Sequence, residues 1–220
     1  LGLLPGPRPV IVLAGCMWDK DHGLKGLIER LLVRLADRAV SFYAVQSSEE
    51  MRLFPQAWGV SPSKMRLCPY FYTITDKDRA PTPPARGDYV FAGGNSHRDY
   101  TPLLEAARRL PHLRFVIATD RLEHELHIPE NVTVGPVSHM EFMSLLQGAH
   151  VVVVPLRQGL TRAVGQQTYL NAMLLGKPTI VNEVHGVHDH IQHKQTALVV
   201  DGTPESYVEM LEWVYDTANH

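Results

Sequence analysis

The chain has 220 residues, of which 45% are hydrophobic and 20% charged, so it has enough apolar material for a globular core. Lysine plus arginine number 21 against 23 aspartate plus glutamate, and this balance excludes a general electrostatic attraction to nucleic acid. The two cysteines predict no disulfide framework, and no run approaches the ~20 apolar residues of a membrane-spanning helix.

The first third of the chain predicts a small α/β lobe. Apolar runs at Pro9–Ala14, Val40–Val45 and Met65–Cys68 are typical of short strands. Leucine or isoleucine recurs at helical spacing from Leu24 to Leu35, which predicts an amphipathic helix. We interpret its charged face as solvated, with a membrane-surface stripe as the alternative. The segment Ser47-Ser48-Glu49-Glu50 predicts the capped start of a second helix.

A polar, proline-rich stretch from Thr73 to Asp88 predicts an interdomain linker. We place the N-terminal lobe at residues 1–75, the linker at 76–87 and the C-terminal domain at 88–220. The linker contains Asp76-Lys77-Asp78, whose charges we expect to be solvated.

Beyond the linker, predicted strands and helices alternate, which is typical of a six-stranded, doubly wound parallel sheet with right-handed crossovers. The predicted fold class is therefore α/β. The strands are Asp88–Ala92, Leu113–Ala118, Asn131–Val134, His150–Val154, Pro178–Val181 and Thr196–Val200. The helices lie around Tyr100–Leu110, Arg121–Leu126, Met140–Gln147, Gln166–Leu175 and Glu205–Asp216.

Three loops follow strands at the expected ligand-binding edge of this sheet: Gly93–Arg98, Gly135–Ser138 and Pro155–Gln167. In the first loop, two glycines let the backbone approach a ligand, and Arg98 supplies charge for phosphate oxygens. The loop is not a G-x-G-x-x-G motif, and the next strand does not end on an acidic residue. We therefore do not expect NAD as a ligand.

The segment from Gly165 to Val181 carries the most information about function. Gly165, Gln166 and Gln167 open a predicted helix that ends at Gly176 before a strand. The preceding loop carries Arg157 and Arg162 toward the helix N-terminus, whose unpaired N–H groups and partial positive charge favour an anion. The alternative is a well-capped core helix behind an ordinary loop.

Four histidines, His185, His188, His190 and His193, lie close together and could bind zinc or nickel. They lack supporting cysteines or a regular ligand pattern, which favours a solvated or substrate-facing loop. The chain shows no Ser-His-Asp order, P-loop or carboxylate pair that would indicate hydrolysis. This leaves chemistry in which the substrate provides the leaving group and the protein stabilises the departing charge.

Several of these segments together resemble a known family. They are the Gly-Gly turn after the linker, Val-x-Val-Gly-Pro-Val, Val-Val-Val-Val-Pro-Leu, Gly-Gln-x-x-Tyr-Leu-Asn-Ala-Met-Leu-Leu-Gly-Lys-Pro-Thr-Ile-Val and the closing Ala-Leu-Val-Val-Asp-Gly-Thr-Pro-Glu-Ser-Tyr. This set resembles the GT-B glycosyltransferases, in particular their retaining family-4 group. The resemblance covers residues 88–216 and, more loosely, Leu35–Cys68.

The resemblance implies two Rossmann-like lobes, the first of them short or truncated. It also implies transfer of a sugar from a nucleotide-diphosphate donor, with retention and without a metal or cofactor. The base and ribose would lie near Gly135–Val137 and Asn171, and the diphosphate near Gly94, Arg98 and the Gly165–Gln167 amides. Arg98 and Arg162 would stabilise the departing diphosphate. The full set of implied donor contacts is Gly93, Gly94, Asn95, Gly135, Val137, Gly165, Gln166, Gln167 and Asn171.

The chain departs from the family pattern in ways that keep alternatives open. Two glutamates that the family spaces as E-x7-E correspond to Ala163 and Asn171 here. A catalytically weak sugar-nucleotide-binding or assembly module is therefore one alternative, and a GT-B-like sugar-nucleotide epimerase is another. The acceptor is open between a saccharide, a lipid-linked glycan and a small molecule. We expect a cytoplasmic protein without a nucleic-acid partner, and leave peripheral membrane contact and oligomer formation open.

Overall fold

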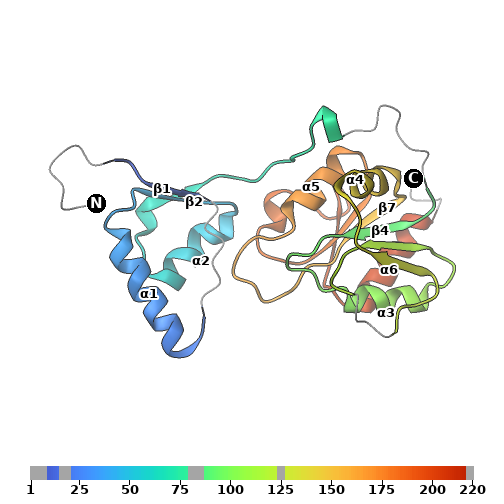
Figure 1. Ribbon diagram of the computed structural model, residues 1–220, viewed down its shortest axis with the longest axis horizontal. Helices are drawn as coiled ribbons and strands as arrows, with labels where there is room; N and C mark the ends of the chain where they lie inside the picture. Colours follow the sequence, from blue (N-terminus) through green and yellow to red (C-terminus); the bar gives the residue numbers. More distant parts are fainter. Residues whose placement is uncertain (1–8, 15–20, 79–86, 123–126, 217–220) are drawn as a thin grey trace. The chain divides into compact units, whose positions relative to one another are not determined.

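The computed structural model describes residues 9–14, 21–78, 87–122 and 127–216. Its contacts divide the chain into two units, each with its own parallel sheet (Figure 1). The first unit comprises Leu1–Tyr70, Gly159–Val164 and His185–Asp189. The second comprises Phe71–Gln158, Gly165–Val184 and His190–His220. Two short segments from the C-terminal half of the chain therefore group with the N-terminal residues.

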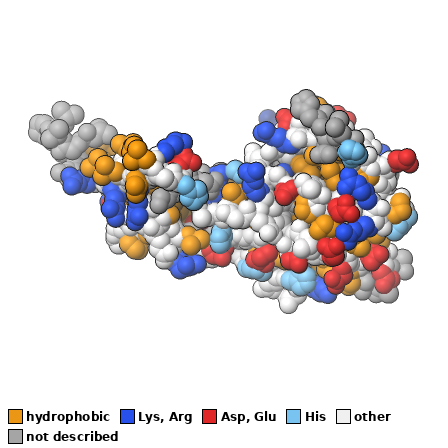
Figure 2. Space-filling model, turned by 90° about the horizontal axis from the view of Figure 1, so that it is seen from below, with side chains coloured by type: hydrophobic (Ala, Val, Ile, Leu, Met, Phe, Trp, Pro, Cys, Tyr) orange, Lys and Arg blue, Asp and Glu red, His pale blue; other side chains and the backbone are white. Residues whose placement is uncertain are grey.

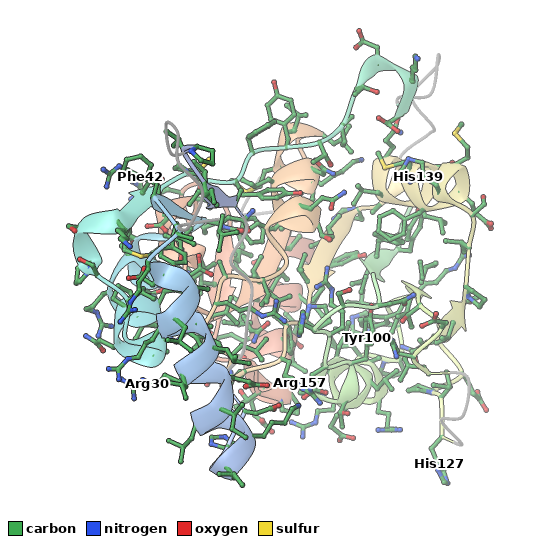
Figure 3. The ribbon with its side chains drawn as sticks, turned by 60° about the vertical axis from the view of Figure 1, so that its left-hand side comes forward. Arg30, Phe42, Tyr100, His127, His139 and Arg157 are labelled. Carbon is green, nitrogen blue, oxygen red and sulfur yellow. The ribbon has the colours of Figure 1, made fainter. Side chains whose placement is uncertain are left out.

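The first unit contains a three-stranded parallel sheet with strand order β1-β2-β3. Its elements are β1 (Val12–Ala14), α1 (Gly23–Asp37), β2 (Phe42–Val45), α2 (Ser48–Trp58), the 3-10 turn Pro62–Lys64 and β3 (Met65–Leu67). Tyr43 and Val45 point from β2 into a core that includes Phe54 and Trp58 of α2. On the opposite side of β2, the Arg66 guanidinium lies 4.2 Å from the ring centre of Phe42, which Figure 3 labels.

Helix α2 begins with the predicted cap. The Ser47 hydroxyl accepts the N–H of Glu50 at 3.2 Å, and the Glu50 carboxylate accepts the N–H of Ser47 at 3.2 Å. Each side chain thus satisfies a backbone donor that the first turn of a helix leaves unpaired.

Helix α1 forms where its leucine spacing predicts it, but with the opposite face inward. Gly26 is buried, and Glu29, Arg30, Val33 and Asp37 are half-buried. The apolar side chains are 51% to 74% exposed, namely Leu24, Leu27, Ile28, Leu31, Leu32 and Leu35. Toward the left of Figure 2, hydrophobic side chains of the first unit lie on the surface beside lysine and arginine side chains. Of the charged face, Lys25 and Arg34 are exposed, as expected, while Glu29 and Arg30 are half-buried.

Polar contacts hold the end of α1 against β2. The Asp37 carboxylate accepts a hydrogen bond from the Tyr43 hydroxyl at 3.0 Å and pairs with the Lys64 ammonium at 3.1 Å. These bonds fix the end of the helix against β2. Hydrophobic periodicity predicts the helix but does not show which of its faces is buried in the structure.

The second unit confirms the predicted six-stranded parallel sheet, with strand order β6-β5-β4-β7-β8-β9. The strands are β4 (Val90–Gly93), β5 (Phe115–Ala118), β6 (Val132–Gly135), β7 (Val151–Val154), β8 (Thr179–Asn182) and β9 (Leu198–Val200). The helices are α3 (Thr101–Arg109), α4 (His139–Gly148), α5 (Gln166–Leu174) and α6 (Pro204–Tyr215). A short 3-10 turn occurs at Asp76–Asp78, and another, at Val187–Asp189, belongs to the first unit.

Helices cover both faces of this sheet (Figure 1). Helices α3 and α6 pack together on one face, where alternate strand residues such as Val90 and Ala92 join the largest apolar core. Helices α4 and α5 lie on the other face, where the Phe91 and Phe142 rings meet edge to face at 5.2 Å. The four-valine strand β7 is buried on both faces, as its sequence predicts.

Two predicted segments fall partly outside the described residues. Of the predicted helix Arg121–Leu126, Arg121 and Leu122 lie in a turn, and residues 123–126 are not described. Of the predicted linker, Asp76–Asp78 form a 3-10 turn, and residues 79–86 are not described. No helix in the described ranges combines the length and hydrophobicity that a membrane span requires.

Candidate functional site

The strand order of the second unit reverses between β4 and β7, and the loops that follow these two strands pair with each other. Arg98 and Leu156 form an isolated antiparallel bridge. The N–H of Asp99 donates to the carbonyl of Pro155 at 3.1 Å, and the N–H of Arg157 donates to the carbonyl of His97 at 2.9 Å. The two loops therefore form one platform at the carboxyl ends of the strands, where ligands of open α/β sheets bind.

The glycine turn after β4 is fixed by side chains from neighbouring elements. Gly94 has a φ of 109°, a region that side chains rarely allow. Its carbonyl accepts a hydrogen bond from the Tyr100 hydroxyl at 2.6 Å, and Asn95 Oδ1 accepts one from the Thr119 hydroxyl at 2.8 Å. Burial raises the pKa of Tyr100 to about 12, so the phenol remains a hydrogen-bond donor at neutral pH.

Arg98 connects this turn to α5. Its Nε donates to the carbonyl of Gly93 at 3.1 Å, Nη1 to the carbonyl of Ser96 at 3.0 Å and Nη2 to the Thr168 hydroxyl at 2.8 Å. Burial lowers the pKa of Arg98, but a guanidinium starts so far above neutrality that it keeps its charge. The bonds use three of the five N–H groups of a guanidinium, so a charged group with further donors stands beside the first turn of α5.

The start of α5 requires a glycine. Gly165 has a φ of 74°, and a Cβ at this position would lie 2.6 Å from a methyl group of Leu156. The first N–H groups of a helix have no partners within the helix and carry partial positive charge. Gln166 is buried and Gln167 is exposed. The structure thus brings Gly93, Gly94 and Arg98 together with the N-terminus of α5.

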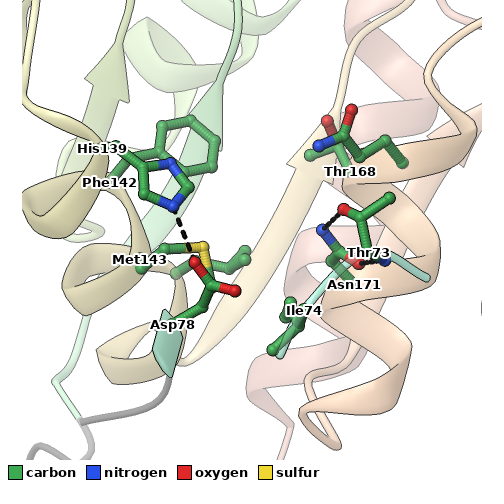
Figure 4. Close-up of a pocket in the computed structure, with 10 residues that line it drawn as sticks. Thr73, Ile74, Asp78, His139, Phe142, Met143, Thr168 and Asn171 are labelled. Carbon is green, nitrogen blue, oxygen red and sulfur yellow. Dashed lines mark hydrogen bonds and ion pairs between the residues drawn. The ribbon is translucent and has the colours of Figure 1, made fainter. Parts of the chain in front are cut away.

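A cavity of about 200 Å³ lies between α4 and α5 in the second unit (Figure 4). Phe142, Met143 and Leu146 of α4 line one side. Gln167, Thr168 and Asn171 of α5 line the other. The segment Thr73–Asp78 contributes Thr73, Ile74 and Asp78 to the lining. The cavity therefore combines apolar walls with a few polar groups, as small-molecule sites do.

Asn171 is only 6% exposed, and its amide bonds to Thr73 on both sides (Figure 4). Its Oδ1 accepts the N–H of Thr73 at 2.8 Å, and its Nδ2 donates to the Thr73 hydroxyl at 3.1 Å. Sequence reasoning nominated Asn171 but not Thr73, because the two residues are 98 positions apart.

Asp78 is held at the cavity by α4. Its carboxylate lies 2.9 Å from Nε2 of His139, which Figure 3 labels at the start of α4, and it also accepts bonds from Thr75. The hydrogen bonds from His139 and Thr75 hold the pKa of the Asp78 carboxyl well below its usual range. The side chain is 22% exposed, so the expectation of a solvated charge is wrong for Asp78.

The other nominated residues lie in different surroundings. Gly135 ends β6, and its carbonyl accepts the N–H of Thr119 at 3.1 Å. A Cβ at Gly135 would meet nothing within 4 Å, and Val137 is half-buried. Neither residue lines the cavity between α4 and α5.

Arg162 belongs to the first unit by its contacts, whereas the other nominated residues belong to the second. It lies beside α2, where it lines a small space with Phe54 and Trp58. The N–H of the adjacent Ala163 donates to the buried Glu50 carboxylate at 2.8 Å. Glu50 was not predicted as a site residue, since its capping position explains its presence in the sequence.

Three of the four clustered histidines have different partners. His185 lies 3.3 Å from the Glu49 carboxylate, His190 lies 3.4 Å from the Gln166 amide, and His193 accepts the N–H of Val199 at 3.0 Å. Throughout the described part of the chain, no group of three histidine, cysteine, aspartate or glutamate residues is arranged to hold a metal ion.

One buried polar residue supports the platform and was missed at the sequence level. Asn182, at the end of β8, is 1% exposed. Its Oδ1 accepts the N–H of Leu156 at 2.5 Å, and its Nδ2 donates to the Leu156 carbonyl at 2.7 Å. The signal in the sequence was an amide directly after a buried Thr-Ile-Val strand.

The family described as "Glycosyl transferases group 1" matches residues 88–217, which is more than half of the chain. No curated protein matches the chain in sequence at a significant level.

Solved structures match most of the chain. HepE from Anabaena in complex with UDP superposes with a TM-score of 0.73 at 16% identity, covering 96% of this chain and 64% of HepE. Sucrose-phosphate synthase from Thermosynechococcus elongatus gives 0.62 at 18% identity, covering 85% of this chain and 53% of the synthase. A glycosyltransferase from Rickettsia africae gives 0.67 at 10% identity, covering 94% of this chain and 60% of that protein. The chain thus shares their fold and spans 53% to 64% of their lengths.

Proposed function

The chain belongs to the group 1 glycosyl transferases, and we propose on that premise that it transfers a sugar from a nucleotide-diphosphate donor to an acceptor. HepE was solved in complexes with UDP and with UDP-glucose, which supports a nucleotide sugar as the donor class.

The observation that carries the proposal is the position of Arg98. Its guanidinium bonds to the glycine turn and to Thr168 in the first turn of α5. A diphosphate between the Gly94 turn and the Gly165–Gln167 amides would meet a fixed positive charge and a helix N-terminus. Fixed donors of this kind suit a leaving group that gains negative charge as its bond breaks.

In the proposed reaction, the bond between the sugar C1 and the diphosphate oxygen breaks, and an acceptor hydroxyl forms the new bond to C1. Arg98 and the α5 N-terminus stabilise the departing diphosphate, and its charge needs no metal ion. The proton of the acceptor hydroxyl leaves with the diphosphate or with solvent. Retention at C1 is proposed from the family resemblance.

The base and ribose are proposed to lie near Gly135, Val137 and Asn171. The acceptor is proposed as a saccharide, a lipid-linked glycan or a small molecule. The exposed leucine face of α1, bordered by Lys25 and Arg34, is compatible with a peripheral membrane contact.

Two observations favour the second candidate function, a sugar-nucleotide-binding module with weak or no transfer activity. The Asn171 amide is already bonded to Thr73. Ala163 is 2% exposed, and its methyl side chain carries no polar group. Neither position offers a carboxylate to the donor.

Calorimetric titration with UDP, GDP, ADP and TDP tests the proposal. We expect at least one nucleotide to bind, and Arg98→Ala to weaken its binding by roughly 1–3 kcal/mol, the cost of a lost charge-assisted contact. Arg108→Ala removes the same charge from the exposed surface of α3 and is expected to leave the affinity unchanged. Equal affinity in the Arg98→Ala protein would reject the assigned diphosphate site.

Release of free nucleotide from the matching nucleotide sugar then separates the two candidate functions. A transferase consumes the donor slowly with water and faster with a mixture of candidate acceptors. A binding module binds the donor and leaves it intact.

A further inference from the structure

We propose that Thr73 competes with the donor ribose for the side chain of Asn171, so that the segment Thr73–Asp78 sets the affinity for the donor. We call this segment the strap. The inference rests on the proposed function, which requires a nucleoside beside Asn171.

Thr73 offers Asn171 the same kinds of hydrogen-bonding groups as a ribose. Thr73 gives Asn171 one donor, its N–H at 2.8 Å from Oδ1, and one acceptor, its hydroxyl at 3.1 Å from Nδ2. The two adjacent hydroxyl groups of a ribose can present the same pair, one donating and one accepting. An asparagine amide that binds one of these partners in this way is complementary to the other.

Thr73 limits the access of a ligand to the Asn171 side chain. The residue is 6% exposed, and Thr73 lies beside it in the wall of the cavity. A ribose hydroxyl can reach both sides of the amide only after Thr73 withdraws. Binding of the nucleoside and bonding of the strap to Asn171 therefore exclude each other.

The strap is attached to α4 at its Asp78 end. There Asp78 lies 2.9 Å from His139, and Gln147 donates to the Asp78 carbonyl at 3.0 Å. Ile74 is 7% exposed and rests against the cavity. The bonds of Thr75 to the Asp78 carboxylate lie within the strap (Figure 4 shows Thr73, Ile74 and Asp78). Thr73 can therefore leave Asn171 while Asp78 stays on α4.

The hydrogen bonds between Thr73 and Asn171 are strong enough for their loss to be measured. Neutral hydrogen bonds contribute modestly to stability, because water replaces them when they break. Giving up the Thr73 contacts thus weakens nucleoside binding by a measurable factor without preventing it.

Thr73→Val tests the competition, because valine has nearly the shape of threonine but cannot accept the Asn171 bond. We expect the affinity for the nucleotide that binds in the UDP, GDP, ADP and TDP titration to rise roughly threefold to tenfold, the range for one neutral hydrogen bond. Thr75→Val is the matched control, because its hydroxyl bonds to Asp78 and not to Asn171. An equal gain in both variants would indicate general loosening of the strap and would overturn the inference.

Two further measurements do not depend on a single variant. In an Asn171→Ala background, Thr73→Val should no longer change the nucleotide affinity, since the partner of the competition is absent. In the unmodified protein, saturating nucleotide should speed hydrogen exchange at the Thr73 amide. Slower exchange would mean that the strap closes on the ligand, which is the opposite of the proposal.

The outcomes separate this inference from the proposed function. A nucleotide that binds the unmodified and Thr73→Val proteins equally well overturns the competition and leaves the proposed function standing. Absence of binding to both proteins overturns both proposals. Binding to the Thr73→Val protein alone supports both.

Discussion

Asn182 and Arg98 fix the same platform from two sides. Asn182 bonds to the N–H and carbonyl of Leu156 after β7, while Arg98 bonds to the turn after β4 and to Thr168 of α5. Because Leu156 also pairs with Arg98, a disturbance at Asn182 would reach the candidate anion site through the backbone. Single polar side chains thus decide the shape of loops that have no regular structure of their own.

Replacement of Asn182 by alanine is expected to lower the free energy of unfolding by roughly 2–5 kcal/mol, because two buried backbone groups of Leu156 lose their partners. Urea denaturation of the two proteins measures this difference. Gln195→Ala removes an amide side chain at an exposed position and is the control, which should change stability far less. A loss at position 182 no larger than that at position 195 would show that the Leu156 bonds are not needed.

Glu50 shows how one carboxylate can serve two segments. It accepts the N–H groups of Gln46 and Ser47 at the start of α2 and the N–H of Ala163, more than a hundred residues away. Only an acceptor with two oxygens can satisfy three donors in this way. The sequence identifies the capping role of Glu50 and gives no sign of the bond to Ala163.

Among the elements, α1 departs furthest from expectation. A leucine stripe normally marks the buried face of a helix, but in this structure it is exposed, while polar bonds to Asp37 fix the other face. By contrast, α3 and α6 bury their apolar faces together in the core of the second unit.

Leu27→Lys and Leu31→Lys together are therefore expected to change the free energy of unfolding by less than about 0.5 kcal/mol, as exposed substitutions usually do. The matched change Leu211→Lys places a charge in the α6 core, where the leucine is 0% exposed, and should prevent stable folding. Urea denaturation and circular dichroism compare the variants. A large loss from the α1 changes would mean that its leucine face is covered in solution.

For the whole molecule, the proposed diphosphate site lies beside β4 and β7, where the strand order of the second sheet reverses. Each of the two units has its own sheet and its own core. The contacts of the segments 159–164 and 185–189 group them with the N-terminal residues, although they follow strands of the second sheet. The chain therefore does not divide at a single point in the sequence.

Sugar transfer is expected to continue in excess EDTA, because Arg98 and the α5 N-terminus would neutralise the donor diphosphate. The measurement is turnover of the donor that binds, with and without EDTA. A His188→Ala, His190→Ala double variant lacks two candidate metal ligands and should turn over the donor as the unmodified protein does. Loss of turnover that added metal restores, together with inactivity of the double variant, would assign the histidines as ligands and refute the metal-free mechanism.

The sequence by itself determined the α/β class, the alternation of strands and helices, the capped start of α2 and the glycines at positions 94 and 165. These features depend on local periodicity and on backbone angles, which neighbouring residues encode. The tertiary structure decided the partners, since Arg98 meets Thr168, Asn171 meets Thr73, and Asn182 meets Leu156 across long stretches of chain. It also decided the rotation of α1. Hydrogen bonds between distant residues leave no periodic trace in a single sequence, and for this reason the fold was predictable while the detailed site was not.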